Sequence, residues 1–295
     1  MDNAPLPPLT RDMDRLRDWI GRSETVTDTL DPRQARLMQV TLDREARFRP
    51  GDALPPFWHY IYFNPELPAS RLKADGHERL GRFLPPVDLP RRMWAGGRVE
   101  IAQPLRIGQR VTKTSTIRDI EMKQGRSGPL CFVTVDHRFE VDGVLHLTET
   151  QDIVYREMPA PGTPQPAGRP APDTALPGRV VTPDPVLLFR YSALIFYGHR
   201  IHYDADYTRD VEGYPGLVVH GPLTVSLLAD FGVEQAPGRR LRALDIRAHS
   251  PLFCPDPIHL ELARDRDRSQ VWARREDGTL AMAVTLHFDP ERKDD

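Results

Sequence analysis

The stretch LAMAVTLHF at residues 280–288 alternates large apolar residues with smaller or polar ones. This two-residue period is typical of a strand that buries one face. The three segments before it show the same alternation: 241–253, 258–267 and 269–276. Asp277-Gly278 precedes the last strand, and such a pair is a strong hairpin signal because both turn positions favour φ > 0. The end of the chain therefore predicts an antiparallel meander.

A helix is predicted directly before this meander. In LVVHGPLTVSLLADFG, residues 217–232, the apolar side chains recur at helical spacing: Leu223, Leu227, Leu228 and Phe231. The last third of the chain thus forms one unit, a helix followed by four strands.

The first half of the chain repeats this order. Helical patterns at 11–21 and 31–43 precede four strand-like segments, near 98–107, 110–121, 130–140 and 144–155. Asp142-Gly143 precedes the last of them, as Asp277-Gly278 does in the second half, and QPLRIGQRV at 103–111 is similar to SPLFCPDPI at 250–258. We expect two copies of one α+β unit, each an antiparallel sheet wrapped around a central helix, because pairing would cover the open edge and face of each.

Proline is concentrated in the middle of the chain. Seven of the nineteen residues from 159 to 177 are proline, a composition that favours extended polyproline conformation over sheet or helix. A length of 295 residues also suits two domains. We predict domains at 1–158 and 179–295 with a linker at 159–178. A Pro-rich ligand for a peptide-binding module is the alternative interpretation of this run.

Composition excludes several classes of function. The 40 basic and 42 acidic residues nearly cancel, which gives no electrostatic reason to expect nucleic acid or a membrane surface as partner. The two cysteines, Cys131 and Cys254, match no metal-site spacing and exclude a disulfide scaffold. No segment has the apolar length of a membrane span or the form of a secretory signal. We expect a cytoplasmic protein.

The chemically informative segment is 190–224, which holds three of the ten histidines: His199, His202 and His220. A zinc site is one interpretation, but no cysteine or acidic residue stands at a fixed metal-site spacing, and we predict no metal. In the other interpretation, Gly221-Pro222 begins the helix, and the Gly221 N–H is an oxyanion donor at the positive end of the helix dipole. The alternative to that is a plain N-cap and turn at His220-Gly221.

The same segment resembles the motif of the MaoC-type, (R)-specific enoyl-CoA hydratases and dehydratases, which have the hotdog fold. In that family a motif ending in Leu/Ile-His is followed about eighteen residues later by His-Gly. Ile201-His202 matches the first element and His220-Gly221 the second, and the two histidines are 18 positions apart. FxGHRIHYD, together with MWAGGRVEIAQPLRIGQRV and GRSGPL in the first half, is similar to the fused double-hotdog subgroup. That subgroup contains 3-hydroxyacyl-thioester dehydratases and mesaconyl-C4-CoA hydratases.

One departure from the family concerns its catalytic aspartate, which falls on Tyr197. A phenol is largely protonated at pH 7 and is a poor base, although it can hydrogen bond to a water or a hydroxyl. The resemblance therefore implies His202 as acid/base, Gly221 as oxyanion donor and Tyr197 as the group that orients the water. For substrate binding it points to four neighbours: His199, Arg200, Gly216 and His220.

The expected activity is addition of water to a 2,3-enoyl-CoA thioester, or its reverse, in a double-hotdog fold of the α+β class. The acyl group would be short or methyl-branched and dicarboxylyl, such as mesaconyl-C4. The alternatives are a 3-hydroxyacyl-thioester dehydratase of fatty-acid synthesis and a non-catalytic acyl-thioester-binding protein. No cofactor is expected, the partner is the acyl-CoA substrate, and a homo-oligomer is compatible with the sequence. The aromatic segment 57–63 and Met93-Trp94 would supply either a tunnel for the substrate or core.

Overall fold

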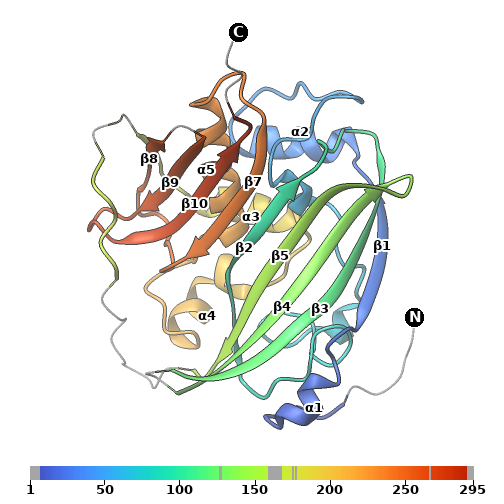
Figure 1. Cartoon of the computed structure of the whole chain (residues 1–295). Helices are drawn as coiled ribbons and strands as arrows, with labels where there is room; N and C mark the ends of the chain where they lie inside the picture. Colours follow the sequence, from blue (N-terminus) through green and yellow to red (C-terminus); the bar gives the residue numbers. More distant parts are fainter. Residues whose placement is uncertain are drawn as a thin grey trace.

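The computed structural model describes residues 7–125, 128–158, 168–174, 176, 178–265 and 267–290. Within this part of the chain, ten strands form one sheet in the order β1-β3-β4-β5-β2-β7-β10-β9-β8-β6, and every neighbouring pair is antiparallel. The sheet curves around the helices, as Figure 1 shows.

The second half of the chain forms the strands that its alternation predicts. They are β7 (Leu241–Ala248), β8 (Ile258–Asp265), β9 (Arg268–Arg274) and β10 (Leu280–Phe288), with the short β6 (Arg179–Val181) at the edge. The predicted helix is α5 (Gly221–Glu234), whose central residues are buried against β7 to β10. Asp277-Gly278 joins β9 to β10, but only Gly278 has a positive φ, at 84°, so the expectation for both turn residues was wrong here.

The first half supplies β2 (Arg91–Ile101), β3 (Arg110–Gly125), β4 (Gly128–Val141) and β5 (Val144–Arg156). Here both residues of the hairpin Asp142-Gly143 have positive φ, 49° and 78°, as predicted. The strand expected at 98–107 begins earlier, at Arg91, and ends at Ile101.

The sequence missed one strand, β1 (Ser23–Thr29). Its segment SETVTDT has almost no apolar pattern. Cross-strand hydroxyl pairs with β3 help to hold the strand in place of an apolar face, among them Thr25 with Thr114 at 3.2 Å. The helix predicted at 11–21 is only α1 (Met13–Arg17), capped by Asp12. The helix predicted at 31–43 is α2 (Pro32–Thr41), capped by Asp31.

The two halves meet in the middle of the sheet, where β2 pairs with β7 from Gly96↔Arg247 to Glu100↔Ala243. Each half therefore covers a sheet edge of the other, as expected. Two further helices, α3 (Pro185–Leu194) and α4 (Ala205–Asp210), and the 3₁₀ turns η1 (Trp58–Ile61), η2 (Ala69–Arg71) and η3 (Arg200–His202) complete the elements. In the first half α2 packs mainly on α3 and η1, so it is a less central helix than α5.

The predicted linker is only partly covered, since residues 159–167, 175 and 177 lie outside the described residues. Its described part runs along the second half of the sheet: Leu280 N–H donates to Arg169 O, and Thr174 Oγ1 donates to Leu262 O. The division into domains at 1–158 and 179–295 stays a prediction.

Candidate active site

A cavity of about 650 Å³ is lined by residues from both halves of the chain. The first half contributes the segment around η1 and parts of β2 and β5. The second half contributes the segment around η3, the start of α5 and the loop after β7. Met93, Trp94 and several aromatic residues of segment 57–63 line it, as expected for a tunnel. The cavity brings together His202, Tyr197, Gly221, His199 and His220.

His202 is buried at the end of η3, and one ring nitrogen is fixed by the backbone. Its Nδ1 lies 2.7 Å from the carbonyl oxygen of Val218. Because a carbonyl only accepts, Nδ1 carries the proton and Nε2 keeps its lone pair. Burial lowers the pKa of His202 to about 4, against the opposing effect of the Val218 bond. At neutral pH the side chain is therefore a neutral base with Nε2 available.

Gly221 is the first residue of α5, and among the described residues none accepts a hydrogen bond from its N–H. The following Pro222 suits the first turn and supplies no competing donor. A Cβ at Gly221 would lie 3.0 Å from Cε3 of Trp94, so a larger residue would crowd the indole as well as restrict the access of a ligand to the N–H.

His220 packs against His202, the predicted acid/base residue. Its ring stacks on that of His202, with the centroids 3.7 Å apart and an angle of 17° between the planes. Its Nε2 is 2.8 Å from Ser192 Oγ. Burial and the two neighbouring histidines hold the pKa of His220 well below its usual value. His220 thus supports His202 as a neutral aromatic platform.

Tyr197 lies beside His202, with ring centroids 5.9 Å apart. Its hydroxyl is 2.6 Å from Nε2 of His77 and 3.5 Å from Nη2 of Arg92, which donates to it. His77 and Arg92 both come from the first half, where the sequence pattern indicated no catalytic partner. The position of the family's aspartate is therefore occupied by a phenol that residues of the other half bind.

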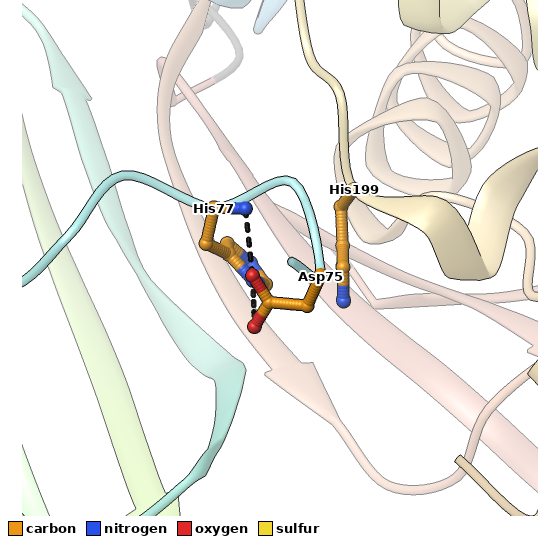
Figure 2. Close-up of side chains that lie close together, drawn as sticks. All are labelled: Asp75, His77 and His199. Atoms are coloured by element: carbon orange, nitrogen blue, oxygen red, sulfur yellow. Dashed lines mark hydrogen bonds and ion pairs between the residues drawn. The ribbon is translucent and has the colours of Figure 1, made fainter. Parts of the chain in front are cut away.

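Asp75, His77 and His199 form a compact cluster at this point (Figure 2), and their potential ligand atoms lie within 4.8 Å of one another. Asp75 Oδ2 is 3.3 Å from His77 Nδ1 and accepts a bond of 2.7 Å from Lys73. The rings of His77 and His199 are 3.8 Å apart. Nε2 of His77 is bonded to Tyr197, whereas Nδ1 is buried, faces Asp75 and forms no hydrogen bond with a described residue. The absence of a metal stays a prediction.

Arg200 and Gly216, predicted to bind substrate, are not among the residues that line the cavity. The Arg200 guanidinium forms an ion pair of 2.7 Å with Asp204 and lies over the Tyr207 ring. An i,i+4 pair of opposite charges is visible in the sequence and could have indicated this. At Gly216 a Cβ would lie 3.1 Å from Cys254 O, which gives the glycine a packing role.

A second polar group lines the cavity within the first half. His59 Nε2 is 2.9 Å from Glu149 Oε2, and both residues are buried. Burial by itself raises the pKa of Glu149, but the bond from His59 and nearby cations bring it down to about 2. This carboxylate is therefore ionised, and the cavity is polar on both sides.

Residues 57–254 match the family described as hydroxyacyl-thioester dehydratase type 2. The chain belongs to this family. It is 44% identical over 274 residues to the mesaconyl-C(4)-CoA hydratase of Chloroflexus aurantiacus, covering 92% of this chain and 96% of that one. It is 27% identical over 236 residues to the mitochondrial hydroxyacyl-thioester dehydratase type 2 of Schizosaccharomyces pombe, covering 70% and 77%.

Among solved structures, a Mycobacterium tuberculosis protein described as having a double hotdog fold matches with a TM-score of 0.56 and 13% identity, over 91% of this chain and 96% of that one. The double-hotdog fold and the family resemblance predicted from the sequence are thereby confirmed. Within the part of this dehydratase-family chain that the structure describes, no helix has the length and apolar character needed to traverse a membrane.

Proposed function

We propose that this dehydratase-family chain adds water across the double bond of a 2,3-enoyl-CoA thioester. The observation that carries the proposal is that one cavity is lined both by His202, whose Nε2 keeps its lone pair, and by Gly221, whose N–H donates to no described residue. A base and an oxyanion donor are the two groups that this reaction needs.

The two groups divide the chemistry between them. The Gly221 N–H binds the thioester oxygen, which makes the β-carbon electrophilic. A water then forms a C–O bond to that carbon and gives its proton to His202 Nε2, while the π electrons move onto the carbonyl oxygen as an enolate. His202 returns the proton to the α-carbon and the thioester re-forms. One water is added, and the enzyme ends in its starting state.

Arg92 supports a dicarboxylyl substrate. It lies on β2 at the cavity, and no carboxylate of a described residue forms an ion pair with it, whereas its neighbour Arg91 pairs with Glu212 at 3.6 Å. A partly buried cation without an anionic partner favours an anionic ligand. The carboxylate of a methylfumaryl chain would supply that charge, and the Chloroflexus relative is named for such a substrate.

The second candidate is dehydration of a 3-hydroxyacyl thioester, which would use the same groups in reverse. The yeast relative, which is named for that activity, favours it. A protein that binds acyl thioesters without turnover is the third candidate, because Tyr197 replaces the family's acid. A cytoplasmic location and a homo-oligomer remain expectations beside these.

The test is a steady-state assay on a panel of enoyl-CoAs, followed through the absorbance of the conjugated thioester. We expect the highest kcat/KM for mesaconyl-C4-CoA and a lower value for crotonyl-CoA. A preference for long unbranched chains would favour the dehydratase. Tight binding without turnover of any member would favour the binding protein.

A further inference from the structure

Two loops from opposite halves of the chain touch through their backbones next to Tyr197. The Arg200 N–H donates to Asp75 O at 2.9 Å. Gly76 has φ +90°, and a Cβ there would lie only 1.7 Å from Gly198 O, so only glycine allows this approach. The segment that carries Asp75 and His77 is therefore fixed against the segment that carries Tyr197.

The side chains continue this contact as a row of three. The Asp75 carboxylate faces Nδ1 of His77 at 3.3 Å, and it also accepts the His77 backbone N–H at 2.9 Å. On the other side of the ring, Nε2 of His77 is 2.6 Å from the Tyr197 hydroxyl. His77 is 4% exposed, which leaves bulk water little room to exchange for either partner.

We infer that Asp75 and His77 are positioning residues for the proposed hydration, acting through Tyr197 to orient the attacking water. The inference rests on the proposed function. The negative charge of Asp75, 3.3 Å from Nδ1, favours the tautomer of His77 with its proton on Nδ1, so Nε2 accepts the Tyr197 O–H. The Tyr197 oxygen then faces the cavity as an acceptor rather than a donor.

This direction of bonding matters for the nucleophile. A water that donates one O–H to Tyr197 and the other to His202 Nε2 keeps its lone pairs for the β-carbon. If Tyr197 donated instead, it would occupy one of those lone pairs. The proton that the water loses goes to His202 and from there to the α-carbon, so Tyr197 neither gains nor loses a proton.

Two electrostatic features agree with this arrangement. Burial and the Arg92 charge lower the pKa of His77 to about 3, so the ring is neutral at pH 7 and able to accept. Although burial by itself raises the pKa of Asp75, the interactions with His77, more than the bond from Lys73, hold it below its usual range, which keeps the carboxylate an acceptor.

The first test is a double-mutant cycle on kcat with the full-length protein. His77→Ala and Asp75→Asn should each lower kcat about tenfold, the value of one net hydrogen bond, with KM little changed. Neither should lower it further in a Tyr197→Phe background. His77→Gln should recover part of the loss, because the amide oxygen accepts the Tyr197 O–H. Lys73→Gln, which removes the other partner of Asp75, is the control and should leave kcat within about twofold.

Losses that add fully to that of Tyr197→Phe, or an equal loss in Lys73→Gln, would overturn the inference in favour of a structural role. A His77→Ala variant that folds and keeps wild-type kcat would overturn it as well, while leaving the proposed function intact.

The second test does not depend on turnover. Nitrogen-15 NMR of histidine-labelled protein should show His77 protonated on Nδ1 and unprotonated on Nε2 at pH 7. It should show a change of tautomer in Asp75→Asn. The Nε2-protonated tautomer in the wild type would overturn the inference at any level of activity. The expected tautomer in a protein that turns over no enoyl-CoA would refute the proposed function alone.

Discussion

Lowering the pH should destabilise this protein before its carboxylates take up protons, because the folded protein buries several neutral histidines. Burial lowers the pKa of His77 and His137 to about 3 and that of His202 to about 4. In the unfolded chain each would titrate near 6.5. As the pH falls below that value, the unfolded state takes up protons that the folded state refuses, so the free energy of unfolding falls.

The size of the effect follows from these values. Each histidine contributes up to about 1.4 kcal/mol per pH unit, or roughly 2 kcal/mol between pH 7.5 and 5. Asp230 opposes them, since burial raises its folded pKa to about 6 and it gains a proton in the folded state first. The net loss is about 4 to 5 kcal/mol, a large part of a typical stability of roughly 5–15 kcal/mol. His199 and His220, with lowered pKa values, act in the same direction.

Urea unfolding at pH 7.5, 6.5, 5.5 and 5.0, followed by the fluorescence of the four tryptophans, measures this loss. His137 lies in the first half, 2.8 Å from Ser115 Oγ, and is not among the proposed catalytic groups. His137→Gln should reduce the slope below pH 6.5 by about 1.4 kcal/mol per pH unit. A free energy of unfolding that stays constant or rises from pH 7.5 to 5, or a His137→Gln slope equal to that of the wild type, would contradict the burial of neutral histidines.

Two further changes test the cavity. Arg92→Leu should raise KM for mesaconyl-C4-CoA at least about tenfold and leave KM for crotonyl-CoA nearly unchanged, since only the former has a free carboxylate on its acyl group; equal effects on both substrates would exclude that role. Gly221→Val should lower kcat by about 100-fold or more through loss of the oxyanion site, and its Cβ, 3.0 Å from Trp94, should also lower the melting temperature. Near wild-type turnover of folded Gly221→Val would remove the N–H from the mechanism.

The parts of the fold that the sequence predicted are those with local signals. The alternation at 280–288 placed β10, and the apolar spacing at 217–232 placed α5. Strand β1 was not predicted because it has no apolar face to bury; its hydroxyl side chains form hydrogen bonds with β3 instead. For α1 the sequence predicted too much: the helical pattern covers residues 11–21, but the helix spans only Met13–Arg17.

For the site, motif spacing identified His202, His220 and Gly221, which lie within one segment. His77 could not be found in this way, because it lies 120 residues from Tyr197 and only the meeting of two halves brings them together. Arg92 lies in β2, and the charged residues of this strand do not alternate in a way that distinguishes side chains facing the cavity from side chains facing solvent. Long-range pairing, not local pattern, decides which of these side chains enter the cavity.

The most direct measurement is kcat of His202→Gln on mesaconyl-C4-CoA, with the fold checked by circular dichroism and melting temperature. Loss of a positioned base should lower kcat by roughly 10²–10⁴ in a folded protein. The Val218 carbonyl that bonds Nδ1 at 2.7 Å can still be met by the glutamine amide, so the local structure should persist. A folded His202→Gln protein with near wild-type kcat would show that water addition does not depend on this histidine.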